Sequence, residues 1–343
     1  MRIGLFVHDT TVRGRIPFLA DYLASHEAQQ RGIITVPLKS LEDLSSSPVD
    51  CVQLVGADRS TAHIAMELSR RKIPFVVYAN TGGVSSMQLV RLLKFGGNIF
   101  GNILSDHLKN IPFASTVYSL SVRVMVPSQQ QASCIEHGFG IPKENIAVVY
   151  PVIDERFFQT DASSLKQELG VEHCIFSIAD DFHPATNALQ LFRSLGKINL
   201  PSIVLGKYSG TKYAEACRQI ANENPHIRVI DDEEEKDKFL FSALAACEVF
   251  VDPSASGLWT PLTVNAAVLG KKVVVSKRSG LGEYFGGGVE FVEPTSWELI
   301  HHGIVTVLNN TTNASLRSFL KEECSISRVL DGLHSCYRSA IVS

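Results

Sequence analysis

The chain has 343 residues, of which 45% are apolar and 20% charged, and its formal net charge at pH 7 is −3. These values are typical of a globular protein and exclude a disordered chain, and the slight acidity gives no reason to expect nucleic acid as a partner. The length is too great for one ordinary core and favours two domains.

Short β-branched runs alternate with longer amphipathic segments along most of the chain. This alternation predicts parallel sheets covered by helices, and two sets of about six strands predict two doubly wound domains with a junction near 151–160. Strands are expected at 3–7, 33–36, 49–54, 75–78, 123–126 and 147–150, and then at 174–178, 202–205, 227–230, 249–251, 272–276 and 289–291. Helices are expected at 17–25, 60–71, 185–195, 212–222 and 236–246.

Cellular location is indicated by what the chain lacks. Its seven cysteines are scattered without metal-ligand spacing, and several lie in apolar runs, as buried thiols of a reducing compartment do. The opening MRIGLFVH is too short for the apolar core of a signal peptide. No window approaches the ~20 apolar residues of a membrane-spanning helix. These features predict a cytoplasmic protein.

The stretch RVMVPSQQQASCIEHGFGIPKENIAVVYPVIDERFF (123–158) resembles the interdomain region of the retaining glycosyltransferases of family four. In that family a strand ends in Pro-Ser, a helix and a glycine follow, and a motif like vvyNGVD---F comes next. Here Pro151 and Val152 replace the usual Asn-Gly. The matching residues are Pro127, Ser128, Gly138, Tyr150, Asp154 and Phe157.

The stretch CEVFVDPSASGLWTPLTVNAAVLGKKVVVS, from Cys247 onward, resembles the family's donor loop, which usually reads PS--EGFG-P-LEA-A-G-PVV. The tail CSISRVLDGLHSCYRS is similar to the family's closing helix, which returns to the first domain. The residues that match the donor loop and its continuation are Pro253, Ser254, Ala266, Gly270, Val273, Val274, Gly282, Glu283, Pro294 and Leu299.

This resemblance implies the GT-B fold, in which two Rossmann-like α/β domains in tandem face each other across a cleft. The acceptor-side domain is expected at 1–155, the nucleotide-sugar-side domain at 156–325 and the returning helix at 326–343. The implied activity is hexosyl transfer from a nucleotide sugar to an unidentified acceptor, with retention and with neither a metal nor a cofactor.

The departures from the family pattern are as specific as the matches. Two family glutamates, one meeting the sugar hydroxyls and one the ribose, are replaced by Gly257 and Asn265. An arginine and a lysine usually neutralise the donor diphosphate from the loop after the first strand of the second domain. That loop here is DDFHPATN, with Asp181 and Thr186 at those two positions and Asn187 kept.

The remaining donor-site candidates depend less on side-chain charge. Pro261 suits the first turn of a helix, so the N–H groups of the next residues would point into the loop and form an anion site. Lys207, Lys277 or Arg278 could replace the missing cations. A plain strand–helix turn and ordinary surface residues are the alternatives. The donor-binding candidates are Gly257, Thr260, Leu262, Thr263, Asn265, Glu283, Lys207 and Arg278.

The acceptor-side candidates lie in the first domain. The segment HDTTVRGRIPF (8–18) is similar to a glycine-containing family loop, with Gly14 and Arg15 matching, and His8 ends the first strand. A plain loop and a half-buried core histidine are the alternatives. Asn80 matches the position of a family histidine, although NTGG is first of all a turn signal.

Residues 87–113 mix apolar residues with cations. Related enzymes meet lipid-linked or membrane-bound acceptors in this region, so a peripheral contact with the inner face of the membrane is one interpretation. An ordinary packed helix pair is the favoured one, because GGN at 96–98 and GN at 101–102 weaken a continuous helix.

Two hypotheses follow, and no catalytic residue is assigned. The first is a metal-independent glycosyltransferase that acts on a nucleotide sugar and a glycan or lipid-linked acceptor. The second is a degenerate, non-catalytic homologue that binds a ligand or stabilises a partner glycosyltransferase. We favour the enzyme, because most chains with this resemblance are enzymes, although the joint loss of both glutamates and both cations favours the alternative.

Overall fold

The computed structural model describes residues 1–6, 22–79, 110–153, 155–159, 161–255, 261–286, 288–310 and 314–342. The chain divides into two compact units, Met1–Val152 with Glu323–Ser343, and Ile153–Glu322. Each unit contains one six-stranded parallel sheet covered by helices, which confirms the expected α/β, doubly wound class. No helix in the described ranges combines the length and apolarity needed to cross a membrane.

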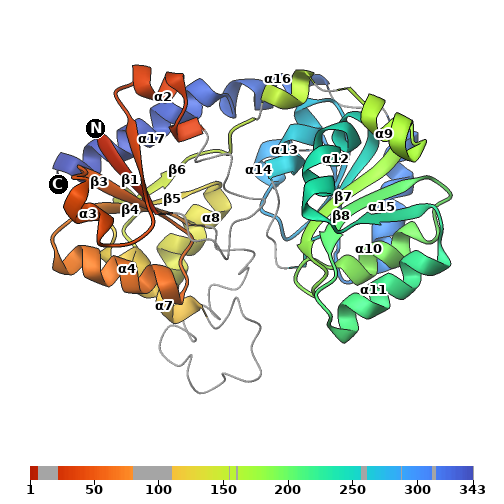
Figure 1. The fold of residues 1–343 in the computed structure, drawn as a ribbon, viewed down its shortest axis with the longest axis horizontal. Coiled ribbons are helices and arrows are strands. Elements are labelled where there is room, and N and C mark those ends of the chain that lie inside the picture. The colour runs from red at the N-terminus through yellow and green to blue at the C-terminus, as the bar shows by residue number, and fades with distance from the viewer. Residues whose placement is uncertain are drawn as a thin grey trace. The chain divides into compact units, whose positions relative to one another are not determined.

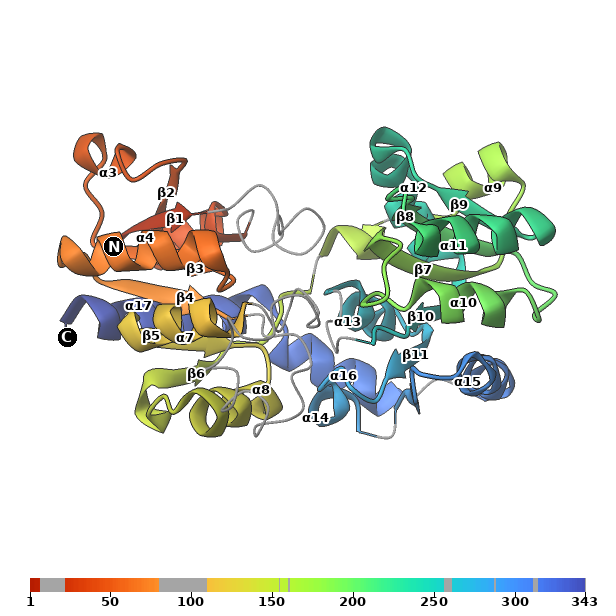
Figure 2. The ribbon, with the colours of Figure 1, turned by 90° about the horizontal axis from the view of Figure 1, so that it is seen from below.

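The sheet of the first unit has the strand order β2-β1-β3-β4-β5-β6, so the chain leaves β1 to one side and returns to its other side at β3 (Figure 2). All neighbouring strands are parallel. The elements of this unit are β1 (Arg2–Phe6), α2 (His26–Gln30), β2 (Ile34–Leu38), α3 (Asp43–Ser46), β3 (Cys51–Val55), α4 (Arg59–Arg70), β4 (Phe75–Tyr78), α7 (Ile111–Leu120), β5 (Arg123–Val126), α8 (Gln129–Cys134), the π-helical turn η1 (Ile135–Phe139), the 3-10 turn η2 (Lys143–Asn145), β6 (Ile146–Val148) and α17 (Ile326–Val342).

Alternation along the strands sends successive side chains to opposite faces of this sheet. Val52 and Leu54 of β3 pack with α4, α7 and η1, whereas Cys51 and Val55 of the same strand pack with α2 and α17. Figure 1 shows α4 and α7 on one side of the sheet and α2 and α17 on the other. The first unit is therefore a three-layer structure that includes the last helix of the chain.

The helix α17 is attached to the first unit by polar contacts as well as by its apolar face. The Tyr337 hydroxyl donates to Gln53 Oε1 in the buried middle of β3. Arg31 Nε lies 2.7 Å from Asp331 Oδ1, and Arg123 Nε donates to Ser339 Oγ at 3.1 Å. Burial raises the pKa of Tyr337 well above its ordinary value, so this hydroxyl stays protonated and remains a donor.

The sheet of the second unit has the order β12-β11-β10-β7-β8-β9, again all parallel (Figure 2). Its elements are η3 (Glu155–Gln159), α9 (Ser163–Leu169), β7 (Cys174–Asp181), α10 (Ala188–Leu195), β8 (Ser202–Lys207), α11 (Lys212–Glu223), β9 (Ile227–Ile230), α12 (Glu233–Ala246), β10 (Cys247–Asp252), α13 (Pro261–Val268), β11 (Lys272–Ser276), α14 (Gly282–Phe285), β12 (Glu290–Val292), α15 (Trp297–Asn309) and α16 (Ala314–Glu323).

One face of the second sheet packs against α10, α11 and α15. The helix α12 contacts β7, β8 and β10, and α13 contacts β10 and β11. The twelve strands expected from the sequence are all present. Four have the expected bounds, at 75–78, 123–126, 227–230 and 272–276, and the other eight have shifted ends. β3 begins two residues later than expected, at Cys51, and β7 runs on to Asp181. The acidic run at 231–238 begins α12 three residues before the expected start at 236, and Asp232 accepts from the N–H groups of Glu234 and Glu235.

Candidate donor site

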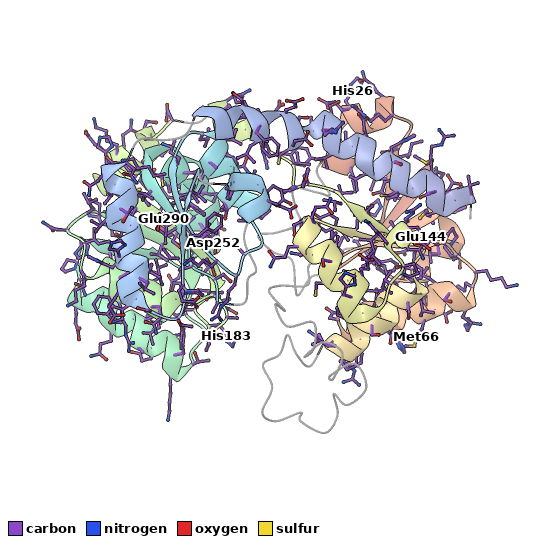
Figure 3. All side chains as sticks on the ribbon, turned by 180° about the vertical axis from the view of Figure 1, so that it is seen from behind. His26, Met66, Glu144, His183, Asp252 and Glu290 are labelled. Atoms are coloured by element: carbon purple, nitrogen blue, oxygen red, sulfur yellow. The ribbon has the colours of Figure 1, made fainter. Side chains whose placement is uncertain are left out.

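The strand order of the second unit identifies the edge of the sheet where a ligand is expected. From β7 the chain adds β8 and β9 on one side and then returns to β7's other side at β10. In open α/β sheets, ligands bind outside the carboxyl ends of the two strands at which the order reverses. These strands are β7 and β10, and Figure 3 labels one residue that follows or ends each of them, His183 and Asp252.

Asn187 connects three loops at this edge. Its side-chain Nδ2 donates to Pro253 O at 2.9 Å and to Pro294 O at 2.6 Å, which lie after β10 and β12. Its backbone is left-handed, with φ of 60°, a conformation that asparagine adopts more readily than most residues. The Ser254 hydroxyl adds a further bond to Ala185 O at 3.2 Å. The loop after β7 is thus held in one position.

The same loop rests on a buried aromatic group. The Phe182 ring is fully buried and lies edge-on to Phe192 and Tyr208, with ring centroids 5.3 and 4.8 Å apart. The Phe182 N–H donates to Lys207 O at 2.9 Å, which joins the loop to the end of β8. Gly206 makes room for this ring, since a Cβ there would lie 2.4 Å from Phe182 Cε1.

His183 follows Phe182 and is exposed at the surface of the braced loop. Its Nδ1 accepts the backbone N–H of Ala185 at 3.2 Å. The Thr186 hydroxyl lies 2.9 Å from both Asp181 O and His183 O. The hydrogen bond from Thr186 thus holds the Asp181 carbonyl group in the same turn, although the Asp181 residue is exposed. Thr186 acts inside the loop rather than presenting its hydroxyl outward.

The first turn of α13 already faces a carboxylate of the chain itself. Asp252, which ends β10, is buried, and its Oδ2 accepts the Thr263 hydroxyl at 2.9 Å. Asn265 is also buried, and its Nδ2 donates to Pro261 O at 2.9 Å, one turn back along the helix. Leu262 belongs to the same buried set. These three side chains contribute to the packing of α13, so contact with a ligand here would be made by the backbone.

The cationic candidates differ in their environment. Arg278 Nη2 lies 2.9 Å from Glu293 Oε1, which places its guanidinium in an ion pair. Lys207 ends β8 and Lys277 follows β11, and both are exposed. Glu283 is exposed in the short helix α14. The described residues include no group of three or more His, Cys, Asp or Glu side chains that could hold a metal ion.

Comparison with solved structures identifies the architecture. HepE of Anabaena, solved in complex with UDP and glucose, is 14% identical, with 98% of each chain covered and a TM-score of 0.71. The sucrose-phosphate synthase of Thermosynechococcus elongatus is 12% identical over 89% of this chain and 80% of its own, with a TM-score of 0.66. WaaG, a glycosyltransferase involved in lipopolysaccharide biosynthesis, is 12% identical over 98% and 99%, with a TM-score of 0.64.

The chain has the GT-B fold. The sequence resemblance predicted this fold, and the prediction is confirmed. No family model and no curated protein sequence matches the chain. Identities of 12–14% to solved structures establish the fold of the chain and leave its activity to be argued from its own residues.

Several candidates on this GT-B chain lie outside the described residues. They include two of the donor loop, Gly257 and Thr260, and most of the segment 87–113. The acceptor-side candidates His8, Gly14, Arg15 and Asn80 also lie outside the described residues.

Three residues at the candidate site of this GT-B unit were not assigned a role from the sequence. Asp252 followed the strand expected at 249–251, Asn187 matched the family pattern without an assigned function, and His183 was part of the loop DDFHPATN. Asp252 offered a signal, an acidic residue at the end of a buried strand and next to Pro253. The role of Asn187 depends on carbonyls 66 and 107 residues later in the chain, which no local pattern indicates.

The hydrogen bond between Thr263 and Asp252 gives a first test of the site's packing. We expect Thr263→Val, which keeps the side-chain shape, to lower the free energy of unfolding by about 1–3 kcal/mol, because the buried carboxylate loses a donor. Thr263→Ser should lose less, since it keeps the hydroxyl. Urea denaturation measures the free energy of unfolding of both variants. Thr306→Val is the control, because Thr306 is only half-buried. Equal stability of Thr263→Val and the unchanged protein would contradict the role of this hydrogen bond.

Proposed function

We propose that the chain is a glycosyltransferase that binds a nucleotide sugar in its second unit and transfers the sugar to an acceptor with retention and without a metal. The observation that carries this proposal is that the loop resembling the family's donor loop follows β10, one of the two strands at the point where the strand order reverses. HepE, which has the same fold, has been solved with UDP and with UDP-glucose, which supports a nucleotide sugar as the ligand.

The proposed donor site combines backbone groups with a few side chains. Pro261 begins α13, and the first N–H groups of a helix have no acceptor inside it, so they can approach a phosphate. Lys207 and Lys277 come from the strands on either side of β7 and β10. Hydrogen-bond donors that are fixed in place before the reaction would stabilise the charge on the leaving diphosphate. Such stabilisation is usually the largest single contribution to the rate of an enzymatic reaction.

Nucleotide binding tests the proposal. UDP, GDP, ADP and their sugars are screened by thermal shift, because a ligand that binds only the folded state stabilises it by about 2.7 kcal/mol at 100 times its Kd. We expect one nucleoside diphosphate to raise the melting temperature. Lys207→Ala should weaken this binding about tenfold, as loss of a charge-assisted contact does. Lys197→Ala is the control, because Lys197 is exposed in the connection that leads into the other end of β8.

Turnover separates the two functional hypotheses. We expect release of the nucleoside diphosphate from its sugar when a suitable acceptor is present. Binding without release, combined with loss of activity of a co-purifying glycosyltransferase when this chain is removed, would support the degenerate homologue instead. If none of the three nucleotides or their sugars shifts the melting temperature, the proposed donor site is wrong.

A further inference from the structure

The His183 side chain is exposed at the centre of the donor edge, and its imidazole can donate a hydrogen bond even when it carries no charge. We propose that the His183 imidazole recognises the diphosphate of the donor by donating its Nε2 hydrogen to a phosphate oxygen. This inference rests on the proposed function and identifies the group that takes over the contact of the missing arginine and lysine.

The first argument is the position of the ring proton. Nδ1 of His183 accepts the Ala185 N–H at 3.2 Å, so in the neutral imidazole the hydrogen lies on Nε2. An acceptor bond at one ring nitrogen also orients the ring. The backbone of this loop therefore holds the exposed His183 as a hydrogen-bond donor through Nε2.

The second argument is the rigidity of the support. The residue before His183 is the buried Phe182, and four residues later Asn187 bonds to two other loops. Rigid placement lowers the entropy that a side chain loses when it binds a ligand. The loop thus fixes the exposed His183 ring in the way that favours ligand binding. A surface histidine without a binding role needs no such support.

The third argument is the distribution of charge along the edge. The first turn of α13 faces the Asp252 carboxylate, so its N–H groups alone hold a phosphate less well and a side-chain donor from a neighbouring loop adds to them. Arg278 is paired with Glu293. In the described loops after β7, β8, β10 and β11, the exposed basic side chains that no carboxylate pairs with are Lys207, Lys277 and His183. His183 alone follows one of the two central strands, with a lysine from the strand on each side.

Two substitutions separate the two ends of the ring. Asn is similar in shape to the Nδ1 half of histidine, so His183→Asn can still accept the Ala185 N–H but has no donor at the outer position. Gln reaches the Nε2 position, so His183→Gln keeps the outer donor and loses the bracing acceptor. His173→Asn is the control, because His173 is exposed and immediately precedes β7 at its other end.

The experiment measures the Kd of the free nucleoside diphosphate and of the corresponding nucleoside, using UDP, GDP and ADP with each variant, together with the melting temperature. We expect His183→Asn to keep its melting temperature and to bind the diphosphate about tenfold more weakly, while nucleoside binding followed by NMR is unchanged. We expect His183→Gln to bind the diphosphate more tightly than His183→Asn despite a lower melting temperature. His173→Asn should match the unchanged protein.

The outcomes distinguish this inference from the proposed function. If the unchanged protein binds a diphosphate and His183→Asn binds it equally well, the inference is wrong and the donor site stands. If His183→Asn loses the diphosphate and the nucleoside to the same extent with a lower melting temperature, His183 is a structural residue. If the unchanged protein binds none of the three diphosphates, both the proposed function and this inference fall.

Discussion

Deleting residues 326–343 is expected to unfold or strongly loosen the first unit, although the deleted helix lies at the far end of the sequence. The helix α17 buries a continuous apolar face on the sheet, and burial of each large apolar side chain contributes about 1.5–3 kcal/mol. Several such contributions are comparable with the whole net stability of a typical domain, about 5–15 kcal/mol. The buried residues are Val329, Leu330, Leu333, Cys336, Tyr337 and Ala340.

Hydrogen exchange locates the effect of the deletion. Amides of β3 and β4, which α17 covers, should exchange much faster, whereas amides of β7 and β8 in the second unit should keep their protection. Deletion of the helix with unchanged exchange in β3 and β4 would contradict this account of α17.

A point-substitution series tests the polar contact within the same interface. Tyr337→Phe removes the donor to Gln53, and Gln53 Nε2 has no hydrogen-bond partner within the described chain, so both ends of this buried amide would then be unsatisfied. We expect a loss of about 1–3 kcal/mol. The double variant Gln53→Leu with Tyr337→Phe should recover most of it, because both partners become apolar. Asp331→Asn, in an exposed ion pair with Arg31, is the control.

The strands of both sheets could be predicted because their signal is local. Buried parallel strands are short apolar runs, such as Val249–Val251 within β10, and the polar segments between them mark the connections. Strand ends were less accurate. β7 continues through Ile178 to Asp181 after a shift of register against β8, and hydrogen bonding to a neighbouring strand sets this end rather than the residues themselves.

Side-chain roles at the candidate site depended on contacts that the sequence does not contain. Asn265 is a donor-binding candidate because it replaces a family glutamate, and in the structure its side chain is buried with Nδ2 donating to Pro261 O. Thr263 is another candidate, and its hydroxyl donates to the Asp252 carboxylate. A short polar side chain near a helix start can point to the backbone, to a neighbouring strand or to a ligand, and only the packing decides which.

The largest effect of a single isosteric substitution is expected at Asn187. Asn187→Asp keeps the shape and tolerates the left-handed backbone, but it replaces the donor Nδ2 with a carboxylate oxygen that faces Pro253 O and Pro294 O. Two buried carbonyls lose their donor at about 1–3 kcal/mol each, and a buried charge is added. For a domain of this size, 1 kcal/mol corresponds to about 2–4 °C, so the melting temperature should fall by roughly 5–20 °C.

The pH dependence of Asn187→Asp shows whether the introduced carboxyl is responsible. Burial against two carbonyl oxygens favours its protonated form, so its pKa is raised in the folded state above its unfolded value. Between the two pKa values the folded state then binds more protons than the unfolded state, so the stability of the variant falls as pH rises. The loss of stability relative to the unchanged protein should therefore be smaller at about pH 5 than at about pH 8. Asn309→Asp is the matched control, since its Nδ2 also donates to a carbonyl, Val305 O at 3.0 Å, but the residue is exposed and its carboxylate can turn to solvent. A fall no larger than that of the control, or one independent of pH, would show that Asn187 does not hold the three loops together, and the braced support of His183 would lose its main contact.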